Sequence, residues 1–148
     1  MPKSPTFLEA FRAALAAGRQ PVPLAELLNF RLTEIEEGRA VVELEADDRH
    51  GNIIGTLHGG VVATIADSAM GLAHASMLEA GELSTTVEFK INFLRSFRSG
   101  RLRAVSRVVK RGRTLSMMEC DVLDEAGQLI ARASGTWMTL PAEQPASA

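Results

Sequence analysis

The sequence predicts one α+β domain in which a curved antiparallel sheet of about six strands wraps around one long central helix. Two strand-like segments precede an apolar helical segment, and four further strand-like segments follow it. The helical segment, residues 59–79, is apolar around most of its circumference, so both of its faces need to be covered. An antiparallel sheet that curls around the helix supplies this cover.

Length and composition limit the class of protein. A chain of 148 residues with 46% hydrophobic and 23% charged residues fits a single globular domain. A net charge of −2 argues against a nucleic-acid binder driven by overall charge. The one cysteine, Cys120, excludes an intrachain disulfide and suits a reducing compartment. With no apolar run near the ~20 residues of a membrane span and no signal-peptide core, we expect a cytoplasmic protein without membrane partners.

The segments follow one another without an internal repeat. Residues 5–17 and 24–28 predict short helices. Six segments predict strands: 30–35, 40–45, 84–94, 101–110, 114–124 and 128–140. We therefore expect an N-terminal helical segment over residues 1–28, the main domain over 29–140 and a flexible tail over 141–148.

The long helix presents two different faces. The stripe expected to face the sheet consists of Val61, Val62, Ile65, Ala66, Ala69, Leu72, Ala73 and Ser76. The opposite face carries Gly60, Ala63, Thr64, Asp67, Gly71 and His74. Small side chains let another backbone approach closely, so we expect a subunit interface beside Asp67.

Asp67 is the only formally charged side chain between His50 and Leu78. Acidic side chains are rarely placed in apolar segments without a partner or a function. A solvated residue on an exposed helix face is the alternative, but the uncharged flanks of Asp67 argue against it. We therefore interpret Asp67 as a catalytic residue.

Around Asp67 the sequence resembles a known family. Residues 52–60 contain the run His58-Gly59-Gly60, and residues 66–71 contain Asp67. This pattern resembles the hotdog-fold acyl-CoA thioesterases, and most closely their phenylacetate-degradation (PaaI-type) branch, in which an Asp follows His-Gly-Gly at this spacing. The resemblance extends from about residue 28 to residue 140 and implies a hotdog fold that hydrolyses an acyl- or aryl-CoA thioester to the acid and CoA.

The chemistry of that reaction fits the residues at the start of the helix. Thioester hydrolysis places negative charge on the carbonyl oxygen, and backbone N–H groups at a helix N-terminus are preorganised donors for such charge. Gly59 and Gly60 lack a Cβ and let a thioester approach closely. The resemblance implies that the Gly59 N–H polarises the carbonyl, while Asp67 acts as general base or nucleophile. No cofactor is expected, because coenzyme A is part of the substrate.

Gly59 and Asp67 are too far apart on one helix to act on one carbonyl. Eight residues of helix separate them by roughly 12 Å. Two antiparallel helices across a dimer interface bring Gly59 of one chain to Asp67 of the other. We therefore expect a homodimer with shared active sites, and the resemblance implies a homotetramer built as a dimer of dimers.

Three further side chains gain possible roles from the resemblance. Asn52 matches an Asn near the thioester or the attacking water; alternatively it makes a local Asx turn. His58 donates to the thioester region or, as we prefer, holds the loop and the helix start. Thr86 matches a Ser or Thr that orients the water; alternatively it reflects strand propensity.

Substrate binding is expected at two places. The turn Arg111-Gly112-Arg113, together with Gly60, is expected to bind the CoA end, since Arg suits phosphate groups. The alternative for each Arg is that it solvates a strand edge. The acyl pocket is expected to be lined by Met70, Met77, Phe89, Phe93 and residues of the N-terminal helix. Phenylacetyl-like and medium-chain acyl groups both remain open.

Two alternative functions fit the sequence less well, and no metal site is expected. A non-catalytic acyl-CoA-binding module is disfavoured by the retained Asp67. A hotdog enoyl-CoA hydratase or dehydratase pairs a His with a differently spaced acid, so it fits less well. His50, His58 and His74 are not spaced as metal ligands, and no metal site is expected.

Overall fold

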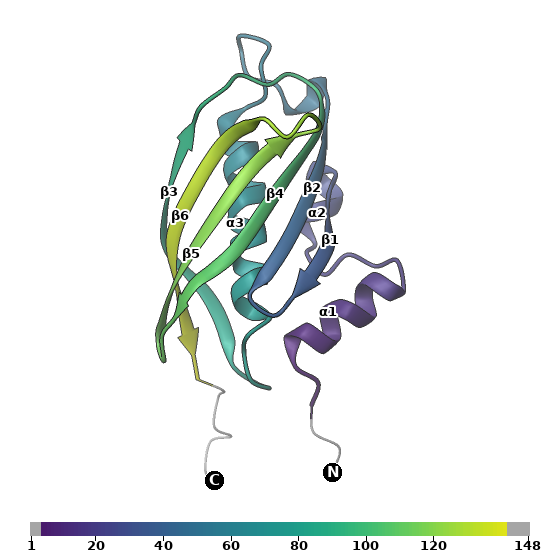
Figure 1. Cartoon of the computed structure of the whole chain (residues 1–148). Coiled ribbons are helices and arrows are strands. Elements are labelled where there is room, and N and C mark those ends of the chain that lie inside the picture. The colour runs from purple at the N-terminus through teal and green to yellow at the C-terminus, as the bar shows by residue number, and fades with distance from the viewer. Residues whose placement is uncertain (1–3, 142–148) are drawn as a thin grey trace.

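A six-stranded antiparallel sheet curves around the helix α3, as predicted (Figure 1). The computed structural model describes residues 4–141. Its helices are α1 (Phe7–Ala16), α2 (Leu24–Leu28) and α3 (Gly59–Ala75), with a 3-10 turn at Asp48–His50. Its strands are β1 (Phe30–Glu36), β2 (Arg39–Ala46), β3 (Leu83–Phe93), β4 (Gly100–Arg111), β5 (Leu115–Asp124) and β6 (Leu129–Leu140). The predicted order of strands and helices is therefore confirmed.

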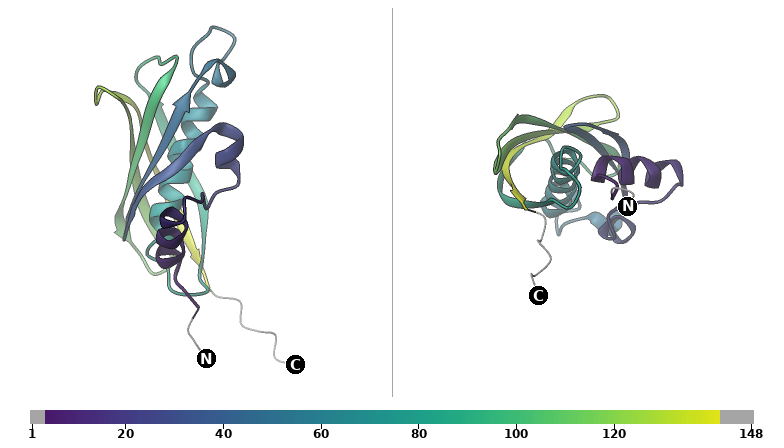
Figure 2. Two further views of the ribbon diagram at one scale, coloured as in Figure 1. Left: turned by 90° about the vertical axis from the view of Figure 1, so that its right-hand side faces the viewer. Right: turned by 90° about the horizontal axis from the view of Figure 1, so that it is seen from below.

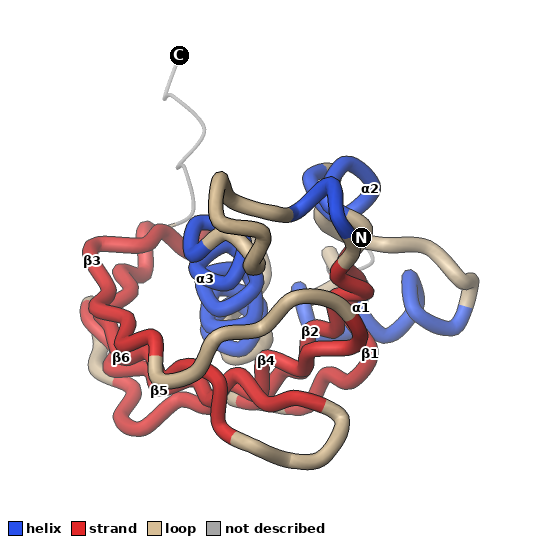
Figure 3. Tube along the Cα trace, turned by 90° about the horizontal axis from the view of Figure 1, so that it is seen from above, coloured by secondary structure: helices blue, strands red, loops and turns tan. Residues whose placement is uncertain are grey.

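One edge of the sheet is covered by helices, and the other is open. The strand order is β1-β2-β4-β5-β6-β3, so β3, which follows the helix, pairs with the last strand, β6. At the other edge, α1 and α2 pack beside β1 (Figures 2 and 3). Within residues 4–141 no element pairs with the outer edge of β3. This edge carries exposed apolar side chains, among them Val87 at 51% and Phe93 at 55% exposure.

The core lies between α3 and the concave face of the sheet. The predicted apolar stripe of α3 is buried there for most of its length, and Ile65, Ala69 and Ala73 are fully enclosed. The opposite face of α3 was expected to be covered by a second subunit, and this expectation is wrong at two positions. His74 is fully buried and bonds to Ser84 and Thr139, while Gly71 faces Trp137. That half of the face is covered by β3 and β6 of the same chain.

The helix α3 ends at Ala75, about one turn before the expected end at residue 79. The Ser76 hydroxyl explains the stop. It donates to the Ala73 carbonyl oxygen at 2.7 Å and accepts the Gly38 N–H at 2.9 Å, so it anchors the helix end to the β1–β2 turn. Such local side-chain bonding competes with continued helix.

The N-terminal segment packs on the main domain. Thr6 and Glu9 form a capping box that starts α1. Leu8, Phe11 and Leu15 of α1 are partly buried and pack against the core. Residues 142–148 of the predicted flexible tail lie outside the described residues. No helix of residues 4–141 is long and apolar enough to cross a bilayer.

Candidate active site

A hydrogen bond between His58 and Gly60 caps the start of α3. His58 is the N-cap residue, and its Nδ1 accepts the Gly60 N–H at 2.8 Å. The backbone N–H of His58 donates to the His50 carbonyl oxygen at 2.8 Å. In this structure His58 therefore caps the helix, which is the structural role preferred above, and the Gly60 N–H is already engaged.

Gly59 provides the free donor. Its N–H is the first of the helix and has no hydrogen-bond partner among residues 4–141. A Cβ at Gly59 would lie 3.1 Å from Cζ of Phe93, so glycine lets the aromatic ring approach the helix start. A pocket of about 390 Å³ opens here, with Asn52, Gly59, Val62 and Phe93 among its lining residues.

Asn52 shapes the loop that leads to this pocket. Its Oδ1 accepts the N–H groups of Ile54 and Thr56 at 3.0 and 3.1 Å, and its Nδ2 donates to the Thr56 hydroxyl at 2.8 Å. These bonds match the local turn described above. Because Asn52 also lines the pocket, its role near the thioester stays a prediction.

Asp67 and Thr86 are brought together, although 19 residues separate them. The Thr86 hydroxyl donates to Oδ1 of Asp67 at 3.0 Å. A bulge between Thr86 and Glu88 keeps Thr86, like Phe89 beyond it, on the face of β3 that points to α3. Burial raises the pKa of Asp67, and the Thr86 hydrogen bond lowers it in part. The net result is a carboxyl group that accepts protons more readily than an ordinary Asp, as a general base requires.

Replacing Thr86 by Val should move the acid limb of the activity profile to higher pH. The change removes the hydrogen bond that lowers the pKa of Asp67, so its ionised form would be lost at a higher pH. Thr86→Ser retains the hydroxyl and should retain the wild-type profile. Measurements of kcat/KM from pH 4 to about 8 compare the three proteins. An unshifted limb in Thr86→Val would separate Thr86 from the titrating group.

The turn Arg111-Gly112-Arg113 lies at the other end of α3 from Gly59. The Arg111 guanidinium donates to the Met77 carbonyl oxygen and lies 3.6 Å from the Glu82 carboxylate. Gly112 is required by the turn, because a Cβ there would lie 2.2 Å from the Leu115 carbonyl oxygen. Arg113 is exposed. One chain therefore does not bring these residues to Gly59 or Gly60, and their role in CoA binding stays a prediction.

The four side chains expected to line an acyl pocket lie in different places. Met70 is fully buried in the core, and Met77 lies against Gly38 at the β1–β2 turn. Phe93 lies at the start of α3, whereas Phe89 stacks on Trp137 with ring centroids 6.4 Å apart. Within one chain the expected pocket is not assembled. Trp137, the largest fully buried side chain, was not among the predicted site residues.

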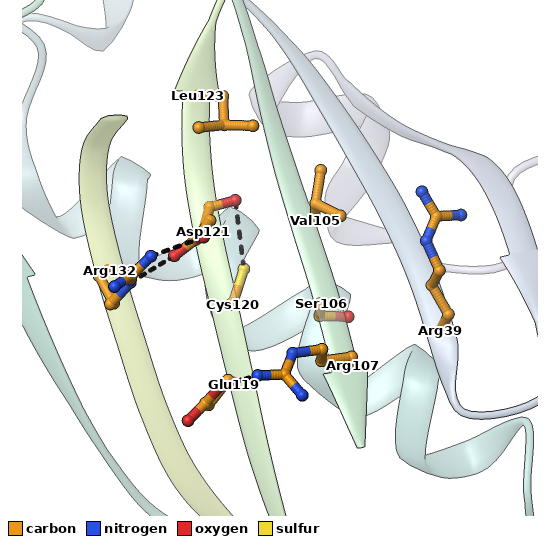
Figure 4. A pocket seen from close by; sticks show the side chains of 9 residues that line it. All are labelled: Arg39, Val105, Ser106, Arg107, Glu119, Cys120, Asp121, Leu123 and Arg132. Atoms are coloured by element: carbon orange, nitrogen blue, oxygen red, sulfur yellow. Dashed lines mark hydrogen bonds and ion pairs between the residues drawn. The ribbon is translucent and has the colours of Figure 1, made fainter. Parts of the chain in front are cut away.

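A second hollow lies on the face of the sheet that points away from α3. Figure 4 shows this pocket of about 320 Å³. Its arginines are paired, Arg107 with Glu119 and Arg132 with Asp121 (Figure 4), and Arg39 bonds to Glu34 outside it. The pairs neutralise the charge of the hollow, and Asp67 and Gly59 do not line it. We therefore assign the chemistry to the α3 side of the sheet.

The remaining candidates for reactive groups are packed into the fold. His50 is buried, and its Nε2 lies 2.8 Å from the Leu28 carbonyl oxygen. Burial raises the pKa of the Cys120 thiol, so this thiol stays protonated and acts as a packing group. Within residues 4–141 no three His, Cys, Asp or Glu side chains gather as metal ligands do. The expectation of chemistry without metal or cofactor stays a prediction.

The buried His74 should make stability depend on pH. Burial and the nearby Arg111 lower its pKa from 6.5, although Glu82 opposes this shift. On acidification the unfolded chain takes up the proton before the folded chain does, so the free energy of unfolding should fall as pH drops below 6.5. Urea unfolding at about pH 7.5 and 5.5 measures this loss, which should be smaller in His74→Asn. Equal losses in both proteins would assign the dependence to other groups.

Comparisons with known proteins identify the family to which the chain belongs. A sequence profile of the thioesterase superfamily matches residues 54–131. Acyl-coenzyme A thioesterase 13 of Homo sapiens is 31% identical over 107 residues, which are 71% of this chain and 76% of that protein. A 1,4-dihydroxy-2-naphthoyl-CoA hydrolase of Listeria monocytogenes is 29% identical over 107 residues, covering 72% of this chain and 87% of its own length.

A solved structure extends the match to three dimensions. A variant of the phenylacetic acid degradation protein PaaI from Thermus thermophilus superposes with a TM-score of 0.75 at 28% identity. The match covers 80% of this chain and 100% of that chain. The resemblance to hotdog-fold thioesterases of the PaaI type is thus confirmed. The chain belongs to the thioesterase superfamily and is a thioester hydrolase.

Proposed function

We propose that this protein hydrolyses an acyl- or aryl-CoA thioester, with a phenylacetyl-like or medium-chain acyl group, to the free acid and CoA. The observation that carries the proposal is a partly buried carboxylate, Asp67, held by Thr86 on the helix that begins with the free Gly59 N–H. Relatives named as hydrolases of CoA esters support the substrate class.

In the proposed reaction the thioester carbonyl oxygen accepts the Gly59 N–H. As the carbonyl carbon is attacked, negative charge develops on that oxygen, and the donor and the helix dipole stabilise it. Asp67 either removes a proton from the attacking water or attacks the carbon itself. The C–S bond then breaks and CoA leaves as a thiolate, which takes up a proton. With Asp67 as nucleophile, water hydrolyses the acyl-aspartyl intermediate in a second step.

Two chains are needed to assemble this site. Gly59 and Asp67 lie eight residues apart on α3, or roughly 12 Å along its axis. The open edge of β3, with its exposed Val87 and Phe93, offers backbone groups to a second copy of β3. Such pairing around a two-fold axis places the two α3 helices side by side and antiparallel. Asp67, bonded to Thr86 on this edge strand, then faces Gly59 of the partner subunit.

The same arrangement gives the 111–113 turn a role. In one chain this turn lies beside the C-terminal end of α3. Antiparallel helices bring that end close to the start of the partner's α3, where Gly59 and Gly60 lie. The exposed Arg113 is then placed to bind the phosphates of a CoA ester in the partner's site. Two such dimers form the proposed tetramer.

A thiol-release assay tests the proposed function. Phenylacetyl-, hydroxybenzoyl- and straight-chain acyl-CoA esters are supplied, and free CoA is measured. We expect turnover of at least one ester. Binding of these esters without thiol release would favour the acyl-CoA-binding module, and hydration of an enoyl-CoA would favour the hydratase.

A further inference from the structure

A buried histidine links α3 to two strands of the sheet. His74 is fully buried, and the Ser84 hydroxyl lies 2.7 Å from its Nδ1, whereas the Thr139 hydroxyl lies 3.3 Å from its Nε2. Ser84 and Thr139 are direct register partners on the β3–β6 ladder. A neutral imidazole has one donor and one acceptor, and each hydroxyl can take either role, so both ring nitrogens have a partner. One ring therefore holds a cross-strand pair against the helix.

The hydrogen bond to Ser84 runs beside the hydrogen bond that holds Asp67. Asp67 and His74 are seven residues apart, which is close to two full turns, so their side chains point to the same side of α3. Ser84 and Thr86 are two residues apart, so their side chains point to the same face of β3. Within residues 4–141 these are the two side-chain hydrogen bonds between α3 and β3, at 2.7 Å and 3.0 Å.

The place of β3 in the sheet makes this anchoring important. It is an edge strand, and within the described part of the chain β6 is its one pairing neighbour. The ladder with β6 is interrupted by the bulge between Thr86 and Glu88, where pairing is locally disrupted. The ladder therefore holds Thr86 less firmly than regular pairing would. The contact at Ser84, two residues earlier, fixes the strand before it reaches the bulge.

We propose that His74 is a positioning residue, which holds β3 through Ser84 so that the Thr86 hydroxyl stays within hydrogen-bond distance of Asp67. His74 is enclosed in the core two turns from Asp67 and does not touch the reacting atoms. Without the bond to Ser84, the start of β3 is free to move away from α3, and the Thr86 bond to the carboxylate weakens. The inference rests on the proposed function, in which Asp67 is the general base or nucleophile.

Ser84→Ala tests the proposal, because it removes the hydroxyl and leaves the imidazole in place. The Thr86 hydrogen bond lowers the pKa of Asp67, so weakening that bond should move the titration of the carboxyl group to higher pH. We expect a midpoint between those of the wild type and Thr86→Val. Carboxyl ¹³C NMR measures the midpoint, with the Asp67 signal identified by its loss in Asp67→Asn. The acid limb of kcat/KM should move in the same direction.

Three further proteins separate positioning from a general loosening of the fold. In the Thr86→Val background, Ser84→Ala should leave the midpoint unchanged, because the bond through which it acts is already absent. Ser84→Thr retains the hydroxyl and should retain the wild-type midpoint. Thr139→Val removes the other hydroxyl from the same ring, but β6 is paired on both sides and does not carry Thr86. The wild-type midpoint is therefore expected for it as well.

The outcomes distinguish this inference from the proposed function. A wild-type midpoint in Ser84→Ala, or an equal shift in Thr139→Val, would overturn the positioning role, while turnover itself would stand. A further shift from Ser84→Ala in the Thr86→Val background would also overturn it, because Ser84 would then act on Asp67 by another route. The titration needs no substrate. A wild-type protein that releases no thiol from any ester would therefore remove the proposed function without deciding how Asp67 is held.

Discussion

Asp67→Asn is expected to lower kcat by roughly 10²–10⁴, with little effect on binding of the CoA ester. The amide cannot accept a proton from water and is a poor nucleophile, but it has nearly the shape of the carboxylate and can still accept the Thr86 hydrogen bond. Thiol release gives kcat, and titration of a CoA ester on the inactive variant gives its affinity.

Asp121→Asn is a matched control for this change. Asp121 lies on the outer face of the sheet and pairs with Arg132 at 2.6 Å, away from α3. Loss of such a partly exposed ion pair costs about 1 kcal/mol of stability or less. Wild-type turnover is expected for Asp121→Asn. Retained turnover in Asp67→Asn would remove Asp67 from the mechanism.

Gly59→Pro is expected to lower kcat/KM by about 10²–10³ relative to Gly59→Ala, as the loss of one donor to the developing oxyanion requires. Proline removes the N–H in question and places its ring there, and the first helical position tolerates this ring. The preceding residue is also compatible, since His58 has the extended backbone angles φ −65° and ψ 129°. Thiol-release kinetics on the best ester measure the ratio.

The alanine variant measures the effect of the added Cβ alone. Both substitutions place a Cβ near the Phe93 ring, and this 55%-exposed ring has room to move. Only proline removes the N–H. Equal activities in the two variants would show that the Gly59 N–H does not stabilise the transition state.

Patterns that depend on neighbours in sequence were predictable. Alternation of residues along the strands and the apolar stripe of α3 gave the correct elements, because burial on one face is encoded locally. The side chains of Asn52 and His58 were predictable for the same reason, since their side-chain hydrogen bonds reach only two to four residues along the chain. The local alternatives for these two side chains describe their observed contacts.

Contacts between distant segments were not predictable from the pattern alone. The helical wheel correctly grouped Asp67, Gly71 and His74 on one face, but it could not identify β3 and β6 as the cover. The same holds for Trp137, which meets Gly71 only because β6 pairs with β3 beneath the helix. Thr86 was identified through the resemblance, whereas its bond to Asp67 depends on a bulge that the sequence does not mark.

Mixed dimers of Asp67→Asn and Gly59→Pro test the shared active site most directly. Each variant alone lacks one half of both sites. If Gly59 of one chain acts with Asp67 of the other, a purified mixed dimer carries both defects in one site and neither in the second. Such dimers should recover about half of the wild-type activity per dimer, as two-fold symmetry requires. Activity no higher than that of the parent variants, in dimers proven to be mixed, would contradict a site shared between subunits.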